Sequence, residues 1–378
     1  MKRIVSFLLL AALVFACFAG CAAAPGELTT VRLNEVTHSV FYAPLYAAMH
    51  LGYFESEGLQ IELTNGGGAD KVMTAVLSGQ SDIGLAGPES CIYVLREGRE
   101  NHAVVFAQLT KRDGSFLVGR EDGDFRWEDL RGSTVLGGRK GGVPEMTLEY
   151  VLRQHGLTPG EDVNVDTSVQ FNMMAGAFTG GNGDYVALFE PTATEVERSG
   201  KGYVLLSIGQ ESGEIPYTAF FALKSTLNGE RDMVQRFTNA LYRGQQWVLT
   251  HSAGEIARAI VEQFPDTDLE VLTAVCQRHL DIDAWNAVPA MKQESFERLE
   301  TVMETAGEGG AWGMALLAGF ALWRRDGQRL EDYLAGQVFA DMQGSRLEPD
   351  AADVAGFDAF LARFRQGLPV ERAAAEHL

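Results

Sequence analysis

The sequence predicts an α/β protein with two lobes, a hinge between them and a helical C-terminal appendage. Residues 31–110 alternate between strand-like and helix-like runs, and a second alternating block begins at about Gly114. From Asn228 to Glu308 the apolar residues keep a helical period. Alternation of strands and helices is typical of parallel sheets with helices on both faces. We therefore predict a parallel sheet in each lobe, followed by a helical return.

The first block has four strand-like runs separated by helices. The strands are expected at residues 31–37, 60–64, 83–86 and 102–110. Pro44 is suited to the first turn of a helix that ends near Leu51, and a helix over 69–78 follows the three glycines at 66–68. A further helix begins at the GPES run of residues 87–90.

The second block repeats this order. A strand at 134–136 leads into a Gly-rich turn, and Pro144 opens a helix that closes at Gly156. Strands are expected at 162–169, 184–190, 201–209 and 217–223, with a helix-like run at 172–181.

The chain is expected to cross between the lobes twice, near 111–116 and near 215–221. The first lobe then comprises 28–113 and 222–308, and the second comprises 114–221. Two extended crossings make a hinge, and a ligand is expected in the cleft where strand ends and helix N-termini converge.

The bulk composition excludes several classes of function. The chain has 378 residues, 46% of them hydrophobic, and a net charge of −20, which indicates a globular acidic protein. Nucleic-acid binding needs clustered Lys and Arg, so we expect no nucleic-acid partner. The cysteines have no metal-ligand spacing, and we expect neither a metal nor a cofactor. Cys91 and Cys276 lie in apolar contexts and favour buried thiols, although a pairing stays open.

The N-terminus has the pattern of an export signal. Lys2 and Arg3 precede an apolar run over Ile4–Phe18, and small residues lead to FAGC, which ends at Cys21. FAGC resembles a bacterial lipobox with Phe18 in place of the usual Leu, which predicts a signal peptide over 1–21 and lipidation of Cys21. The alternative is an uncleaved membrane anchor, because residues 4–24 carry no charge. Both place the body outside the cytoplasmic membrane.

Two candidate ligand-binding stretches lie in the first block. THSVFYAP follows the first strand, where Phe41 and Tyr42 could stack on a planar ring and His38 and Ser39 add polar groups. Packing of both rings in the core is the alternative. In GPES, Gly87 lets the backbone approach a ligand and Glu89 lies at the cleft mouth, with Pro88 between them as a further candidate, unless the run is only a capping turn.

Three more candidates lie in or after the second block. GGRKGGVPE combines Arg139 with Gly141 and Gly142 at a helix start, which favours an anion site, with a solvated turn as the alternative. Glu190 ends a strand before Pro191 and suits recognition of an amine or amino-heterocycle, unless it is solvated. Tyr217 in the second crossing could close over the ligand or pack in the core.

No grouping of a nucleophile with a base is found, and neither GxSxG nor HExxH occurs. Apolar and aromatic residues with a few polar anchors indicate binding rather than catalysis.

From about Leu28 to Glu308 the chain resembles the substrate-binding proteins of ABC importers, in the SsuA/THI5-like (NMT1-like) group. The stretches that carry the resemblance are FYAPLYAAMHLGYFESEGLQIEL, GGGADKVMTAVLSGQSDIGLAGPE, GGRKGGVPEMTLEYVL, LFEPTATEVE and EIPYTAF. The resemblance implies a two-lobed periplasmic-binding-protein fold of type II that closes on a ligand and docks on a membrane permease and its ATPase. In pyrimidine-binding relatives, aromatic stacking and a carboxylate would correspond to Phe41, Tyr42 and Glu190.

An enzyme is the alternative from another class. Some eukaryotic members of this superfamily make the thiamine pyrimidine with a Cys-rich run and a histidine, and this chain has no such run. We therefore expect a non-enzymatic binding protein. Its expected ligand is an amino-heterocycle, such as a thiamine-related pyrimidine, or else a small sulfonate-like anion.

The last segment, 309–378, changes character after AGE. GEGGAWGMALLA and EPDAADVAGFDAFLARFRQGLPVERAA resemble the C-terminal end of FGGY-family carbohydrate kinases of the xylulokinase/ribulokinase kind, without the remaining parts of such a kinase. The tail is then a packed helical appendage, a vestigial fusion or a chimeric join.

Overall fold

The computed structural model describes residues 28–96, 99–306, 320, 327–334 and 336. The expected signal peptide, Cys21 and nearly all of the kinase-like tail lie outside these residues. The chain divides into two units, residues 1–323 and 324–378, and each is treated by itself. In the second unit the described residues include the short helix α16 (Leu330–Tyr333).

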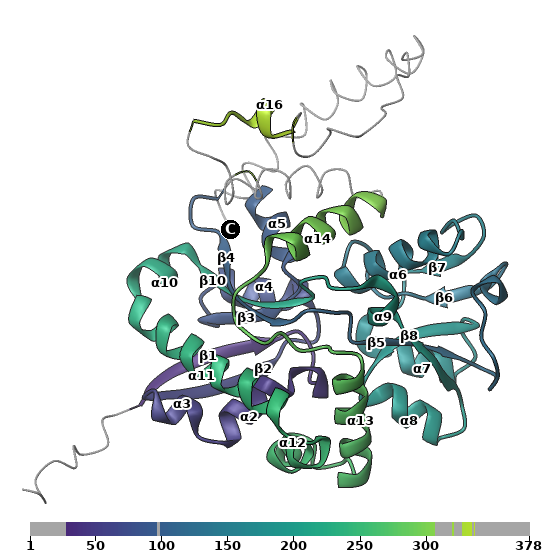
Figure 1. Ribbon diagram of the computed structural model, residues 1–378, viewed down its shortest axis with the longest axis horizontal. Coiled ribbons are helices and arrows are strands. Elements are labelled where there is room, and N and C mark those ends of the chain that lie inside the picture. The colour runs from purple at the N-terminus through teal and green to yellow at the C-terminus, as the bar shows by residue number, and fades with distance from the viewer. Residues whose placement is uncertain (1–27, 97–98, 307–319, 321–326, 335, 337–378) are drawn as a thin grey trace, which may run out of the picture. The chain divides into compact units, whose positions relative to one another are not determined.

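The first unit is built around two sheets, which Figure 1 shows next to each other. The strands are β1 (Thr29–Glu35), β2 (Leu59–Asn65), β3 (Ile83–Ala86), β4 (Ala103–Thr110), β5 (Ser115–Gly119), β6 (Thr134–Leu136), β7 (Asn164–Asp166), β8 (Tyr185–Phe189), β9 (Tyr203–Ser207) and β10 (Thr218–Leu223). The α-helices of this unit are α2 (Ala43–His50), α3 (Tyr53–Ser56), α4 (Ala69–Leu77), α5 (Glu89–Arg96), α6 (Val143–Gln154), α7 (Met174–Thr179), α8 (Thr192–Arg198), α9 (Ile208–Ser212), α10 (Lys224–Gly229), α11 (Arg231–Thr250), α12 (Ala253–Ile260), α13 (Leu269–Asp281) and α14 (Gln293–Thr305). Short 3-10 helices are η1 (Val40–Tyr42), η2 (Trp127–Leu130), η3 (Phe171–Met173) and η4 (Val261–Gln263).

Both sheets are mixed, so the prediction of parallel sheets is wrong in one strand of each. The first sheet has the order β2-β1-β3-β10-β4, and β10 runs antiparallel to both of its neighbours. The second has the order β7-β6-β8-β5-β9, and β5 is antiparallel to β8 and β9. The chain enters β5 and β10 directly from the other lobe. Each of these strands therefore runs opposite to its neighbours in the sheet.

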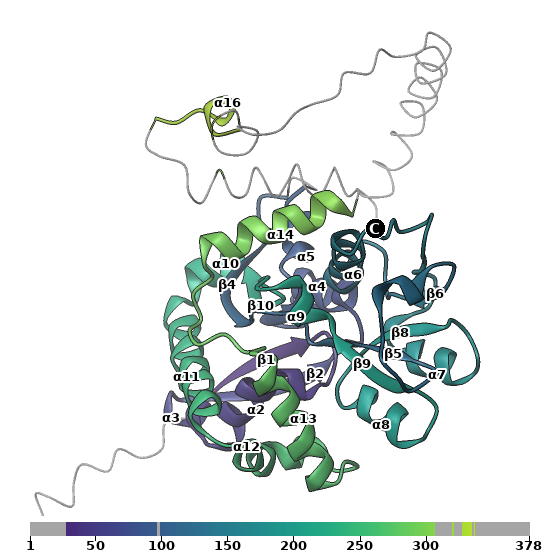
Figure 2. The same ribbon diagram turned by 45° about the vertical axis from the view of Figure 1, so that its right-hand side comes forward.

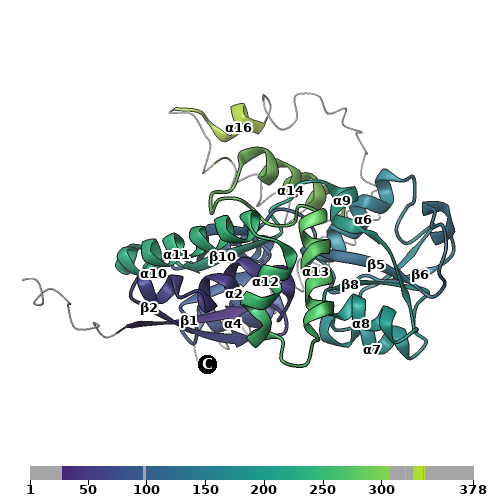
Figure 3. The same cartoon turned by 60° about the horizontal axis from the view of Figure 1, so that its bottom comes forward.

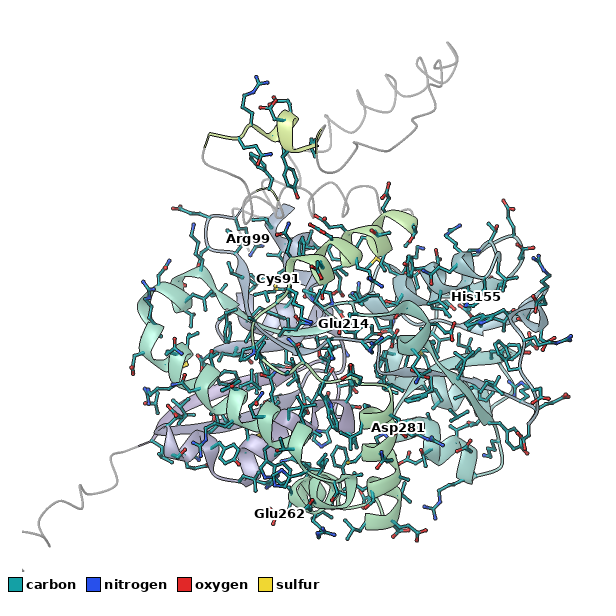
Figure 4. The ribbon with its side chains drawn as sticks, in the orientation of Figure 1. Cys91, Arg99, His155, Glu214, Glu262 and Asp281 are labelled. Carbon is teal, nitrogen blue, oxygen red and sulfur yellow. The ribbon has the colours of Figure 1, made fainter. Side chains whose placement is uncertain are left out.

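The two crossings lie side by side at the centre of the first unit. The segment after β4 and the segment before β10 are joined by hydrogen bonds from Ile215 N to Lys111 O (2.8 Å) and from Tyr217 N to Thr110 O (3.3 Å). Lys111 also contacts Glu214 at 3.5 Å, and Figure 4 labels Glu214 in this central region. The two predicted crossings are therefore bonded directly to each other.

The helical return covers the first sheet and then reaches the second lobe. Helix α11 buries one amphipathic face against α2 and α3, where a Cβ at Gly244 would collide with the Pro44 carbonyl. Figures 2 and 3 show α13 between α12 and α8 of the second lobe. Helix α14 packs on α6. The return thus ties the lobes together on two sides of the crossings.

Candidate functional site

A small cavity of about 80 Å³ lies between the two lobes, and we call it the cleft cavity. Its lining comes from the loops that follow β1, β3 and β6, from the start of α4 and from the second crossing. Six of the residues predicted from the sequence meet here: Tyr42, Gly87, Glu89, Arg139, Gly142 and Tyr217. Residues of both lobes are therefore needed to form this cavity.

Three helices begin at or beside the cleft cavity, each with an acidic residue in its first turn. Asp70 is in the first turn of α4, and Glu89 opens α5. In α6 the first-turn acid is Glu145, whose carboxylate accepts a hydrogen bond from Gly141 N at 3.0 Å. Carboxylates in first turns compensate the partial positive charge of a helix N-terminus.

Glu89 is the most perturbed acid of the cleft cavity. The residue is 2% exposed, and its Oε2 atom has no hydrogen-bond partner among the described residues. Burial raises the pKa of Glu89 to about 7, against the lowering effects of Arg139 and of the backbone N–H groups of Glu89, Ser90 and Val143. A Cβ at position 87 would collide with this carboxylate, which explains the glycine there.

Arg139 faces Glu89 across the cleft from the loop before α6. Its Nη2 atom lies 4.0 Å from Glu89 Oε1, and its side chain is 46% exposed. The contact joins the second lobe to the first. The Glu89 carboxylate also offsets part of the positive charge of Arg139, which the sequence analysis had predicted would bind an anionic ligand.

Tyr217 and Asp113 come from the two crossings and interact electrostatically, and Tyr217 lines the cleft cavity. Burial raises the pKa of Asp113 to about 6, while interactions with Ser115 and Tyr217 lower it. Both side chains are almost fully buried. Movement of one crossing against the other therefore alters this contact directly.

The two aromatic residues after β1 have different surroundings. Tyr42 lines the cleft cavity. Phe41 does not, because its ring is enclosed by the rings of Tyr42, Phe189, Tyr217 and His279 at 5.6–5.8 Å between centroids. Its predicted role as a stacking platform is therefore not open to it in this arrangement.

A second cavity, of about 220 Å³, lies next to the first and includes His38, Ser39 and Glu190 in its lining. We call it the side cavity. Ser39 Oγ donates to the Glu190 carbonyl at 2.5 Å, which joins the loop after β1 to the end of β8. The peptide bond between Glu190 and Pro191 is cis.

The Glu190 carboxylate is already fully engaged within the protein. It accepts from Thr194 N and Thr194 Oγ1, both at 2.9 Å, and from Arg278 Nη1 at 2.7 Å. Arg278 also donates to Glu197 at 2.9 Å. Since Arg278 is on α13 and both acids belong to the second lobe, Arg278 forms two interlobe ion pairs, one with Glu190 and one with Glu197. The predicted use of Glu190 for an amine does not fit this set of contacts.

His38 is held between two acceptors. Its Nδ1 lies 2.6 Å from Glu35 Oε1, and its Nε2 lies 2.9 Å from the Gln263 carbonyl. Only the imidazolium has an N–H on both nitrogens, so these contacts favour the charged ring. Burial lowers the pKa of His38, but the bonds to Glu35 outweigh it and the net change is upward. Tyr46 donates to the other oxygen of Glu35 at 2.6 Å.

The remaining predicted residues, Pro88 and Gly141, lie outside both cavities. The Gly141 carbonyl accepts from Tyr93 at 2.7 Å, another bond between the lobes. Pro88 borders a larger apolar groove of about 450 Å³ beside β4, α5 and residues 289–296. None of the loops of the second lobe contributes to this groove, so lobe closure cannot enclose a ligand there.

Sequence reasoning missed several lining residues of the cleft cavity. They are Thr37, Asp70, Gln170, Phe171, Phe189 and Thr218. The three glycines at 66–68 were a usable signal for Asp70, because such a run before a helix lets a ligand approach its first turn. Gln170 and Phe171 carried no local signal.

Several expectations about the rest of the chain can be compared with the structure. Cys91 and Cys276 are buried free thiols, which confirms the favoured interpretation. No helix within the described ranges is long and apolar enough to cross a membrane. In the same part of the chain, no three His, Cys, Asp or Glu side chains are grouped as metal ligands.

Comparisons with solved structures show the fold. The alkanesulfonate-binding protein SsuA from Xanthomonas axonopodis pv. citri, bound to MOPS, matches 78% of this chain and 96% of its own, with 17% identity and a TM-score of 0.60. The nitrate-binding protein NrtA from Synechocystis PCC 6803 matches 83% of this chain and 91% of its own, with 17% identity and a TM-score of 0.61. Two α/β lobes of the periplasmic-binding-protein type are therefore the architecture of this chain.

Sequence comparison gives a nearer relative and a family. "Putative binding protein YtlA" of Bacillus subtilis (strain 168) is 44% identical over 297 residues, which are 78% of this chain and 89% of that protein. The model of the NMT1/THI5-like family matches residues 40–254. The chain belongs to the NMT1/THI5-like family and has the periplasmic-binding-protein fold.

Proposed function

We propose that this chain is the solute-binding component of an ABC importer. It captures a small molecule between its lobes and delivers it to a membrane permease. The observation that carries the proposal is the cleft cavity, whose lining combines both lobes and the second crossing. A ligand bound in this cavity contacts both lobes and the second crossing. It therefore binds the closed state more tightly than the open state, and so it favours closure.

The interlobe contacts support closure as the working motion. Arg278 with Glu190, Tyr93 with Gly141 and Arg139 with Glu89 lie at different places around the cleft. None of them belongs to the crossings themselves. Opening would break these contacts while the bonded crossings stay intact, which is the behaviour of a hinge.

The N-terminal pattern supports export and anchoring of this component. We propose that the chain is a lipoprotein attached through Cys21 to the outer face of the cytoplasmic membrane. Mass spectrometry of the mature N-terminal peptide tests this, and replacement of Cys21 by Ser should release the protein into the medium or periplasm. We assign no role in transport to the kinase-like tail.

Two classes of ligand are candidates: an amino-heterocycle and a small anion. An amino-heterocycle is supported by the aromatic lining of the cleft cavity and by the buried acid Glu89. A small anion is supported by Arg139 and by the solved structures of sulfonate and nitrate binders. We propose binding without turnover for either.

Native mass spectrometry of the full chain, purified gently from its own host, tests the proposed function. We expect a small molecule that stays bound in the gas phase and is released on unfolding. A deletion strain should also lose uptake of that molecule. A protein that carries no solute, from a strain whose uptake is unchanged, would contradict the proposal. Chemical conversion of the solute during incubation would instead indicate an enzyme.

A further inference from the structure

The apolar groove of about 450 Å³ beside β4 lies apart from the interlobe cleft. Its lining comes from α5, from β4, from residues 289–291 and from the first turn of α14. All of the lining residues except His102 and Gln108 are apolar, and none carries a fixed charge. Contiguous apolar surface of this kind marks a place where another part of a protein binds.

The strand along this groove, β4, is an edge of the first sheet. It pairs with β10 on one side. On the other side it is bonded near one end, where Gln108 N donates to the Pro289 carbonyl at 2.7 Å. Among the described residues, no backbone group outside β10 pairs with residues 103–107. An open edge tends to pair with other chains, and proteins often cover such an edge with a helix or a loop.

The segment 309–323 has a sequence suited to covering an apolar groove. It reads GGAWGMALLAGFALW and has no charged residue, although 22% of the whole chain is charged. One face of a helix over this segment would be formed by residues at intervals of four, four and three, namely Trp312, Leu316, Phe320 and Trp323. Phe320, the one described residue of the segment, is helical and partly buried.

We propose that the segment 309–323 packs as an amphipathic helix in the groove of its own chain, with this apolar face toward β4 and α5. The inference favours the packed helical appendage among the three interpretations of the tail. It does not depend on the proposed function, because the groove lies outside the interlobe cleft.

The connection between the groove and the segment is long enough for this contact. Phe296 lines the groove from the first turn of α14, and Thr305 ends that helix. The nine positions between them correspond to about 14 Å along the helix axis. Trp312 follows Thr305 by seven residues, which span up to roughly 23 Å when extended. The chain can therefore turn back after α14 and place Trp312 over the groove.

The covalent connection favours the chain's own segment over other occupants. An uncharged run with two tryptophans is an aggregation hazard when it is exposed, and so is an open strand edge. Packing one against the other removes both hazards at once. Because the segment is tethered close to the groove, its effective concentration there is far above that of a second copy or of another protein.

Cys91 is a natural reporter of whether the groove is covered. It is a free thiol on α5, where Figure 4 labels it, and it belongs to the lining of the groove. Cys276 is a second free thiol on α13, outside the groove lining and fully buried. The two thiols therefore give a signal and an internal control in the same molecule.

The test measures how fast Ellman's reagent labels each thiol in the native full chain, with peptide mass spectrometry to separate Cys91 from Cys276. Phe320→Asp places a charge on the proposed contact face. Ala318→Asp is the matched control, because it places the same charge on the opposite face of the same helix. Met291→Asp alters the groove itself. Circular dichroism establishes that each variant is folded, and analytical ultracentrifugation gives its oligomeric state.

We expect slow labelling of Cys91 in the wild type and labelling at least about tenfold faster in Phe320→Asp, because the rate follows the opening of the cover. Ala318→Asp should stay within about twofold of the wild type, and Cys276 should stay unreactive in every variant. Met291→Asp should also speed the labelling of Cys91. Adding Phe320→Asp to it should give no further increase, since both changes remove the same contact.

Three outcomes would overturn the proposal. The first is rapid labelling of Cys91 in the wild type, and the second is equal labelling in Phe320→Asp and Ala318→Asp. The third is slow labelling that is lost on dilution together with a dimer seen by ultracentrifugation. That result would identify a second copy of the chain as the occupant of the groove and exclude the contact within one chain.

Discussion

The interlobe ion pair of Arg278 allows a quantitative prediction for Arg278→Gln. Its bond to Glu190 is 2.7 Å long, and the Glu190 side chain is completely buried while Arg278 is 32% exposed. A hydrogen bond to a charged group contributes about 1.5–3 kcal/mol. The second bond, to Glu197, joins two side chains that are each 32% exposed and adds roughly 0–1 kcal/mol.

Two further considerations determine how much free energy of unfolding Arg278→Gln removes. Removing one partner of a buried pair costs about 3–5 kcal/mol when the other is left unpaired. Glu190 keeps both bonds from Thr194, so the loss is smaller than that. We therefore expect Arg278→Gln to lower the free energy of unfolding by about 2 kcal/mol and the melting temperature by roughly 4–8 °C.

The assay is urea unfolding followed by circular dichroism, together with differential scanning calorimetry. Arg258→Gln on α12 is the control, because Arg258 is exposed and its change should stay within about 0.5 kcal/mol. A double-mutant cycle with Glu190→Gln should give a coupling energy of at least about 1 kcal/mol. A coupling near zero, or an Arg278→Gln protein as stable as the wild type, would refute the role of this pair.

Three further predictions follow from other contacts. Although burial lowers the pKa of His38, hydrogen bonding raises it overall, so its stabilising effect is present below its unfolded value of about 6.5 and is lost as the pH rises through the folded value. The urea midpoint should therefore fall more steeply from pH 6 to pH 9 in the wild type than in His38→Gln; equal slopes would refute this. Burial raises the pKa of Cys91 and raises that of Cys276 to about 12, so Ellman's reagent should label neither thiol until the protein unfolds, whereas rapid labelling of the native protein would contradict their placement. Gly87→Ala should displace the Glu89 carboxylate and weaken ligand binding at least about tenfold in calorimetry, and unchanged affinity would show that Glu89 is not held by this glycine.

The order of strands and helices could be predicted because each element has its own local pattern. The strand expected at 217–223 is found at Thr218–Leu223, and the helix opened by Pro144 starts at Val143. The direction of β10 could not be predicted, since it depends on which strands lie next to it after a crossing from the other lobe. The strand expected at 201–209 ends at Ser207, whose side chain begins α9 by accepting from Gln210 N.

The position of the site could be predicted better than the roles within it. Loops after strands meet at one edge of each sheet, so residues chosen from those loops do line the cleft cavity. Glu190 shows the limit of this reasoning. Its partner Arg278 is 88 positions away on a helix of the other lobe, and no local pattern connects them. Phe41 is similar, because three of the four rings around it, those of Phe189, Tyr217 and His279, come from distant segments.

The acids at the three helix starts also bear on how such a protein can diversify. The backbone at each start is suited to bind an anion, and the side chains of Asp70, Glu89 and Glu145 cancel that preference. One nucleotide change is enough to convert a Glu codon to a Gln codon, and it would expose the helix end without altering any strand or crossing. On the proposed function, a lineage built on this scaffold can therefore change the sign of charge of the solute that it binds in very few mutational steps, while its two crossings are inherited unchanged.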